Sequence, residues 1–330
     1  MLKLEDYVNG LGKTVFMDPS SIRGLGYSVF GKVYYVDKEN GSDDSDGITA
    51  GTAFATVSKA YASVTSNNND VIVLSTNGSH AVSAMITTAK NRVTFIGADF
   101  TGRKYGQAAR ISLGVTTVAT DIAALKNTGV RNSFVNVKVS NNNTKAESLY
   151  GIVDAGEYAL YDHVEMYKST HLSNTGAAEL LLEGDSSQFN NCTIGSLANA
   201  LSGAVSRPCV LIDKNIVSGK VARDCSFNSC NFWRKAGNAA NVFVKLVANG
   251  DAERLIEFND CKFINNPLGT TMTEAIHSAA GNNTALLLFN NCVSYNATNF
   301  CGDTNNGLVF AYGTSTVGTT VGMSVQVSAT

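Results

Sequence analysis

The stretch IEFNDCKFI, residues 256–264, has apolar side chains at Phe258, Cys261 and Phe263 with polar residues between them. The gap is three residues and then two. A flat strand alternates with period two, and a helix repeats at three and four residues. The stretch therefore predicts a strand, a tight corner, and a second strand whose side chains point inward again. Asp260 would turn the chain, because Asn, Asp and Ser tolerate the left-handed conformation.

The same phrase recurs five more times along the chain. The other copies are SQFNNCTIG, CSFNSCNFW, LLFNNCVSY and the weaker NSFVNVKVS and ALYDHVEMY. The fourth letter falls at positions 137, 164, 192, 230, 261 and 292, in steps of 27, 28, 38, 31 and 31. Such self-similarity is typical of a stacked repeat architecture.

Short β-rich runs lie between these phrases, and they select the class of repeat. The runs are ELLLEG, CVLID, NVFVKLV and ALLLF, and turn-forming residues flank them. None shows the long 3.6-residue period of a helical solenoid. Each repeat is therefore predicted to consist of a strand, a turn, a second strand, an Asn-rich corner and a third strand. The predicted fold is all-β, a right-handed parallel β-helix over residues 33–300.

Stacking would bring equivalent side chains of successive coils about 4.8 Å apart. The predicted core ladders are an aromatic one (Phe134, Tyr161, Phe189, Phe227, Phe258 and Phe289) and a thiol one (Cys192, Cys230, Cys261 and Cys292), continued by Val137 and Val164. These cysteines are predicted to act as small buried apolar side chains rather than to bind a metal or take part in redox chemistry. Cys225 falls outside the inward phase of its corner.

Composition restricts the partners and the compartment. The 330 residues carry a net charge of −2, which predicts neither nucleic-acid nor membrane binding. No apolar run approaches membrane-spanning length, and Glu5 and Asp6 interrupt what would be a signal peptide. Seven cysteines with ladder-like spacing predict reduced thiols and synthesis in a reducing cytoplasm. No cofactor is expected.

The two ends of the chain lack the repeated phrase. Residues 1–32 form an irregular arm, either a local cap or a tether to a partner. An amphipathic helix near residues 54–64 would cover the open end of the solenoid. Residues 301–330 are a β-rich tail that would cap the last coil or pair between subunits.

The segment YYVDKENGSDDSDGITAGTAFATVSKA, followed by VIVL and VTFIGA, resembles the N-terminal segment of right-handed β-helices of the pectate-lyase-like superfamily. The segment ELLLEGDSSQFNNCTIG also resembles β-helix proteins among the virion genes of tailed bacteriophages. This resemblance implies a non-enzymatic virion protein, made in the bacterial cytoplasm. It would be a capsid decoration or head-spike subunit, a homotrimer anchored to capsid proteins through the arm. The alternative is a tail spike that binds or degrades host polysaccharide.

Candidate catalytic acids are present, but their positions also suit turn formation. They are Asp154, Asp162, Glu183, Asp185, Asp213, Asp224, Asp251 and Asp260, with Asp185 and Asp251 after Gly at equivalent turns. His163 occupies a corner position, and the remaining histidines, His80, His171 and His277, show no acidic partner. We therefore predict no catalytic site.

Three further features leave alternatives open. Asp43, Asp44 and Asp46 form either a solvated turn or a calcium site, although no EF-hand spacing follows. No metal site is predicted. Trp233 is the only tryptophan, which gives weak support for a saccharide-binding face. Residues 195–208 are an insertion that is either a neutral excursion or a contact loop.

Overall fold

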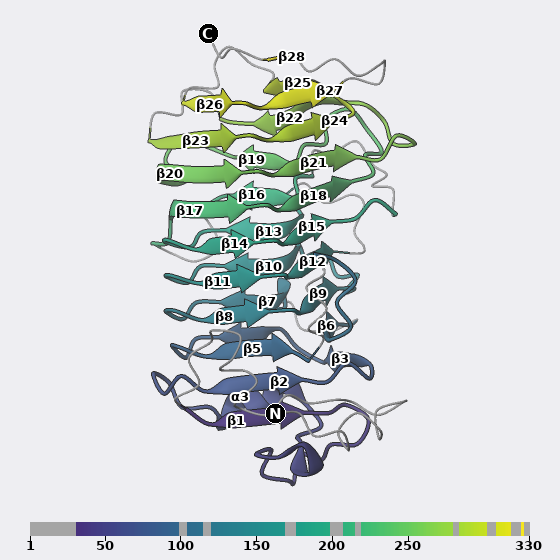
Figure 1. Cartoon of the computed structure of the whole chain (residues 1–330), viewed down its shortest axis with the longest axis vertical. Coiled ribbons are helices and arrows are strands. Elements are labelled where there is room, and N and C mark those ends of the chain that lie inside the picture. Colours follow the sequence, from purple (N-terminus) through teal and green to yellow (C-terminus); the bar gives the residue numbers. More distant parts are fainter. Residues whose placement is uncertain are drawn as a thin grey trace.

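The computed structural model describes residues 31–98, 104–114, 120–168, 176–198, 207–214, 219–279, 284–301, 308–317 and 325–326. These residues wind into a right-handed parallel β-helix, with β1 at one end and β26–β28 at the other (Figure 1). The fold class predicted from the repeated phrase is confirmed.

Three parallel sheets run along the stack, and each complete coil supplies one strand to each of them. Sheet A contains β1 (Val33–Val36), β2 (Val71–Leu74), β5 (Thr94–Gly97), β8 (Ser133–Val135), β11 (Leu160–Asp162), β14 (Gln188–Asn190), β17 (Ala222–Asn228), β20 (Ala252–Asn259), β23 (Ala285–Asn290) and β26 (Val309–Tyr312). Sheet B contains β3 (Ser79–Val82), β6 (Arg110–Leu113), β9 (Lys138–Asn141), β12 (Glu165–Lys168), β15 (Thr193–Gly195), β18 (Asn231–Arg234), β21 (Lys262–Asn265), β24 (Val293–Tyr295), β27 (Ser315–Val317) and the antiparallel β28 (Val325–Gln326). Sheet C contains β4 (Ile86–Thr88), β7 (Ala123–Asn127), β10 (Tyr150–Asp154), β13 (Ala178–Leu182), β16 (Val210–Ile212), β19 (Val244–Leu246), β22 (Met272–His277) and β25 (Ala297–Cys301).

A short helical segment lies at the N-terminal end of the stack. It comprises η1 (Ala50–Thr52) and α3 (Val57–Ser63). The Thr56 side chain caps α3 by accepting a hydrogen bond from the Lys59 N–H at 3.1 Å. The helix buries Val57 and Ala60 in the core that the first strands share. This helix covers one open end of the solenoid, since terminal coils need a cap.

The corner between sheets A and B has the left-handed geometry that the phrase predicts. In the six coils from β8 to β23 one residue has a positive φ there: Asn136, His163, Asn191, Ser229, Asp260 and Asn291, all between 52° and 54°. A second left-handed position lies just before β8, β11 and β14, at Arg131, Tyr158 and Ser186, and within the longer strands β17 and β20, at Asp224 and Arg254. Arg and Tyr have no special preference for this conformation, so the sequence carries no local signal for the second position.

The aromatic ladder lies in the core and gains Phe95 at its N-terminal end. Neighbouring rings from Phe95 to Phe289 stack with centroids 4.4–5.2 Å apart and interplanar angles of at most 16°. In-register pairing produces this stack, as for Phe227 and Phe258 in β17 and β20.

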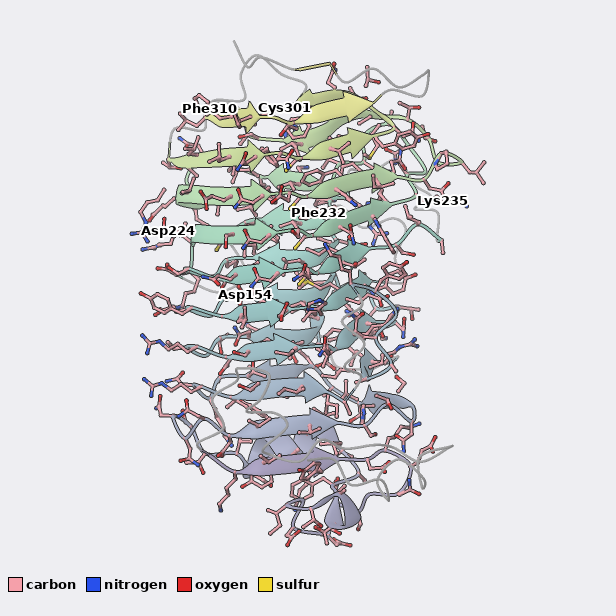
Figure 2. The ribbon with its side chains drawn as sticks, in the orientation of Figure 1. Asp154, Asp224, Phe232, Lys235, Cys301 and Phe310 are labelled. Atoms are coloured by element: carbon pink, nitrogen blue, oxygen red, sulfur yellow. The ribbon has the colours of Figure 1, made fainter. Side chains whose placement is uncertain are left out.

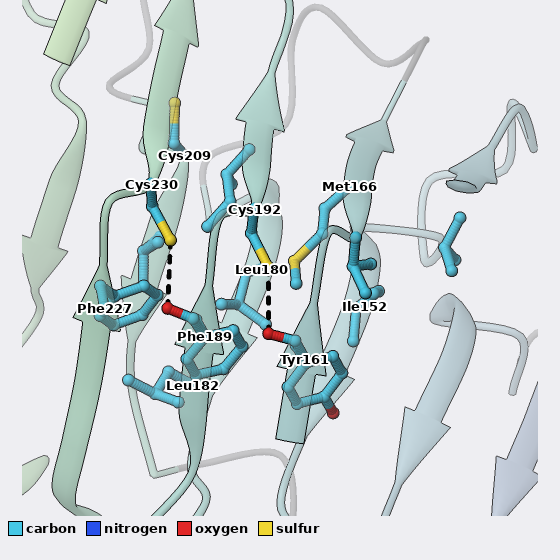
Figure 3. Packing of buried hydrophobic residues seen from close by; sticks show 14 of the residues in the cluster. Ile152, Tyr161, Met166, Leu180, Leu182, Phe189, Cys192, Cys209, Phe227 and Cys230 are labelled. Carbon is cyan, nitrogen blue, oxygen red and sulfur yellow. Dashed lines mark hydrogen bonds between the residues drawn. The ribbon is translucent and has the colours of Figure 1, made fainter. Parts of the chain in front are cut away.

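The thiol ladder runs beside the aromatic ladder (Figure 3). Each thiol donates a hydrogen bond to the carbonyl oxygen of an aromatic residue in the preceding coil, as Cys230 does to Phe189 at 3.2 Å. Thr314 continues the series through its hydroxyl, which donates to the Phe289 carbonyl at 3.2 Å. Cys225 also lies in this core, with 1% of its surface exposed, so the expectation that it faces away was wrong. It precedes Phe227 by two residues in the same strand and shares its inward face.

Candidate functional site

An open groove of about 770 Å³ lies on the outer face of sheet B. Its described lining residues are Lys104, Tyr105, Gly106, Asn231, Trp233 and Lys262. Tyr105 and Trp233 form an aromatic pair, with ring centroids 5.1 Å apart and planes inclined at 52°. Tyr105 is 56% exposed, so the pair presents an aromatic surface to solvent.

Strand alternation explains why Trp233 faces outward. Phe232 in β18 is buried in the core, and successive side chains of a strand point to opposite faces. Asn231 therefore shares the outer face with Trp233, and Lys262 pairs with Asn231 in the next strand. These three side chains come from two neighbouring strands of a rigid sheet. The two strands are about 4.8 Å apart.

Gly195 precedes Trp233 in the same column of sheet B. Its φ is +98°, and a Cβ there would meet the Trp233 carbonyl oxygen at 2.1 Å. Ile264 and Tyr295 follow in the next two coils. The column thus offers a small residue, then an aromatic, an aliphatic and an aromatic residue along the solenoid axis.

The second wall of the groove is the segment at Lys104–Gly106, which lies against higher coils. The Lys104 carbonyl oxygen accepts a hydrogen bond from the Thr193 hydroxyl at 2.7 Å. The Lys104 ammonium donates to the Ser229 carbonyl oxygen at 2.7 Å. The Gly106 N–H donates to Glu165 at 2.9 Å. Three contacts to three different coils hold Tyr105 in place over Trp233.

The described lining of the groove is positively charged. Lys104 and Lys262 are among its six described lining residues, and none of the six is acidic. Lys262 is exposed, so its ammonium can reach a bound molecule. The nearby carboxylate of Glu165 forms an ion pair with Lys138 and accepts the Gly106 N–H. The arrangement suits a ligand with an apolar ring face and a negative charge.

Basic partners neutralise two of the predicted acids. Asp185 lies 3.6 Å from Arg223 and 3.7 Å from Arg254, and Asp224 lies 2.7 Å from Arg254. Figure 2 shows Asp224 at the edge of the stack, near the start of β17. Arg223 pairs in register with Asp185 in the preceding coil and with Glu253 in the following coil. The residue equivalent to Asp185 is therefore Glu253 and not Asp251. The expected equivalence of these two turns was wrong.

The other predicted acids differ in their surroundings, although Glu183 and Asp213 lie in neighbouring coils and both act on Tyr150. Asp154 is fully buried, where it accepts hydrogen bonds from Asn127 and Tyr161, and burial raises the pKa of its carboxyl. Asp251 is also buried and accepts the Ala248 N–H at 2.8 Å. Glu183 is buried, Asp213 is half-buried, Asp260 forms a corner, and Asp162 pairs with His163. The structure therefore does not bring these eight acids together in one groove.

The histidines differ from expectation in one case. The sequence shows no partner for His277, but its Nδ1 lies 2.6 Å from Glu274 Oε1. The pair lines a groove of about 310 Å³ on sheet C, with Lys245 and Thr273. An imidazole oriented by a carboxylate can accept a proton, so this is the second candidate site. His163 has a similar partner in Asp162 at 2.8 Å, His80 is buried against the Ser75 carbonyl oxygen, and His171 lies outside the described residues.

The acidic loop at residues 42–47 is organised by its own hydrogen bonds. Asp43 accepts the backbone N–H groups of Ala55 and Thr56, and Asp46 accepts the Thr52 hydroxyl at 2.6 Å. Among the described residues, no group of three or more His, Cys, Asp or Glu side chains is placed to hold a metal ion. Within the same residues, no helix has the length and apolar character needed to cross a membrane.

Some of the segments singled out in the sequence lie outside the described residues. They are residues 1–30 of the arm, residues 199–206 of the insertion and much of the C-terminal tail. Within the tail, β26 and β27 stack in parallel on β23 and β24 and add a further layer to the solenoid.

Sequence reasoning missed the partner of Trp233. The phrase CNFW places Trp233 on the outer face, because Phe232 is the inward residue. Tyr105 has no comparable signal, since its position depends on contacts that span up to 125 residues.

The comparisons with known proteins show the fold. No family model matches the sequence, and no curated protein matches it. Among solved structures, a pectin methylesterase from Aspergillus niger is 12% identical with a TM-score of 0.59, covering 91% of this chain and 92% of that one. A rhamnogalacturonan lyase is 14% identical with a TM-score of 0.60, covering 87% and 74%. A pectate lyase is 12% identical with a TM-score of 0.57, covering 88% and 72%.

The chain has the pectate-lyase-like β-helix fold. At these identities the likeness extends to the fold alone, because one fold hosts many functions. The function has to be argued from the groove.

Proposed function

We propose that this protein is a rigid saccharide-binding β-helix that holds an acidic polysaccharide in the groove at Trp233. The observation that carries the proposal is the pairing of Tyr105 and Trp233 beside Lys262, with no acidic residue among the described lining residues. Aromatic faces pack on the apolar face of a sugar ring, and lysines attract carboxylate or sulfate groups.

The architecture supports the binding of an extended ligand. The groove residues belong to stacked strands, so their spacing is set by the backbone rather than by mobile loops. Trp233, Ile264 and Tyr295 continue along the axis in successive coils. The structurally similar proteins are named for pectin, pectate and rhamnogalacturonan, which agrees with a polysaccharide ligand.

The virion setting implied by the sequence resemblance belongs to this proposal. Within that setting, the groove favours a tail spike that binds host polysaccharide over a capsid decoration. The homotrimer and the attachment through residues 1–32 are part of the same hypothesis. Light scattering of the purified protein tests the trimer. Labelling of this protein in purified virus particles tests its position on the virion. A monomeric mass, or label on the capsid alone, would remove these parts of the proposal.

Affinity electrophoresis in gels that contain polygalacturonate or neutral dextran tests the binding itself. We expect retardation by the uronate polymer, and we expect Trp233→Ala to weaken it about tenfold, which corresponds to about 1.4 kcal/mol. Lys262→Gln should weaken uronate binding and increase its tolerance to salt.

Tyr312→Ala is the matched control. Tyr312 is 75% exposed but lies in the last coil, away from the groove lining. If uronate polymers, dextran and sulfated polysaccharides all leave the mobility unchanged, or if Trp233→Ala behaves as the Tyr312 control does, the proposed function is wrong.

A further inference from the structure

A second concentration of charge lies inside the protein, where the strands of sheet B end and those of sheet C begin. Lys168 ends β12, Arg234 ends β18, Glu179 belongs to β13, and Arg207 precedes β16. The exposed fraction is 1% for Lys168 and 2% for each of the other three. Charged side chains are almost never buried to this extent unless they are paired.

Arg234 forms an ion pair with Glu179 that neutralises the carboxylate. Its Nη1 and Nη2 atoms donate to the two carboxylate oxygens at 3.2 and 2.8 Å, which is a bidentate ion pair. Nη2 also lies 3.1 Å from the Cys209 sulfur. Glu179 and Arg234 therefore form a nearly neutral unit.

Lys168 and Arg207 have no comparable partner. The Lys168 ammonium donates to the Asn143 carbonyl oxygen at 2.7 Å, and that oxygen is uncharged. The Nε and Nη1 groups of Arg207 are buried, and no described residue accepts a hydrogen bond from them. Three cations thus share one carboxylate.

The acids that are close in sequence do not supply the missing charge. Between Lys168 and Arg207 the sequence contains Glu179, Glu183 and Asp185. Asp185 pairs with Arg223 and Arg254 at another corner. Glu183 acts with Asp213 on Tyr150, whose pKa is raised by burial and by these two carboxylates.

We propose that this cluster binds a small inorganic anion, which Arg207 and Lys168 hold in the folded protein. Burying ions without compensating charge carries a large free-energy cost, so the native state requires either neutralisation or a counterion. A water molecule would satisfy the Arg207 N–H groups but would leave the charge uncompensated. The planar fork of a guanidinium suits a halide or one edge of an oxyanion.

The electrostatics agree with this assignment. Burial lowers the pKa of Lys168 to about 7, with a further contribution from Arg207, and burial also lowers the pKa of Arg207. A bound anion would oppose both effects. Its affinity should therefore increase as the pH falls through 7 and Lys168 becomes charged.

The test measures the melting temperature of the full chain after exchange into sodium gluconate, whose anion is too large for a buried site. Chloride or inorganic phosphate is then added at constant ionic strength. We expect a saturable rise of a few degrees with at least one of the two anions. Chloride alone would indicate a halide site, and phosphate alone would indicate an oxyanion site.

Arg207→Gln should remove this anion dependence, whereas Arg254→Gln should retain it, because the Arg254 side chain is 57% exposed. If Arg207→Gln does not fold, Lys168→Met should weaken the response instead. Crystals of the wild-type chain grown with bromide should show anomalous density near Arg207. Identical melting temperatures in gluconate, chloride and phosphate, or bromide crystals without that density, would overturn the proposal.

Discussion

The thiol of Cys261 donates a hydrogen bond to the carbonyl oxygen of Phe227, one coil below, at 3.4 Å. Cys292 makes the same contact with Phe258 at 3.2 Å. The cysteines therefore join neighbouring coils as well as filling space beside the aromatic ladder. A thiol is a weak donor, and at Thr314 a hydroxyl makes the equivalent contact.

Substitution of Cys261 tests this role. Cys261→Ala removes both the buried sulfur and the hydrogen bond, and we expect it to lower the free energy of unfolding by about 1–3 kcal/mol. Cys261→Ser keeps a donor at the same position, so it should cost less than the alanine variant. Urea denaturation of both variants provides the measurement. A serine variant less stable than the alanine variant would show that the thiol acts as apolar volume only.

Phe258 lies between two stacked rings of the aromatic ladder, with its ring centroid 4.8 Å from that of Phe227 and 4.5 Å from that of Phe289. We expect Phe258→Ala to destabilise the protein by about 3–5 kcal/mol, because the cavity removes stacking contacts on both faces. Leu268 is 85% exposed, so Leu268→Ala should change the stability by less than about 0.5 kcal/mol. Equal effects of the two substitutions would contradict the ladder.

The accessibility of the thiols gives a third prediction. None of the seven cysteines forms a disulfide, and only Cys301 is partly exposed. Burial raises the pKa of Cys209 to about 12, which suppresses the reactive thiolate. Labelling of the native protein with a thiol reagent at pH 8 should therefore modify Cys301 first, and unfolding should release the other six. Rapid labelling of Cys230 or Cys261 without unfolding would be inconsistent with this core.

The sequence predicted the solenoid but neither the groove nor the buried charged cluster, and the reason is physical. The corner at Asp260 depends on local chemistry, and the spacing from Phe258 to Cys261 repeats wherever the same corner recurs. The parallel solenoid follows from that repetition. The groove depends instead on Tyr105, and the buried cluster on Lys168. Neither residue has a local pattern, because their partners come from distant coils.

The last prediction concerns the pH dependence of stability. The pKa of Lys168 falls from its usual 10.5 to about 7 in the folded protein, mainly because of burial. Between these two values the unfolded chain binds one more proton than the folded chain does. The free energy of unfolding should therefore rise with pH from about 7 upward, with a slope of at most about 1.4 kcal/mol per pH unit. Below pH 7 both states are protonated, and the penalty of burying the charge is present in full.

Urea denaturation in gluconate at pH 6.5 and 7.5 measures this slope, because the unfolded thiols, with pKa values near 8.5, stay mostly protonated over this range. Lys168→Met keeps the apolar stem of the side chain and removes the charge. It should be more stable than the wild type at pH 6.5, and its stability should depend less on pH. Lys262→Met is the control, since Lys262 is exposed and should retain the wild-type slope. A Lys168→Met variant with the slope of the wild type would show that Lys168 stays charged in the folded protein.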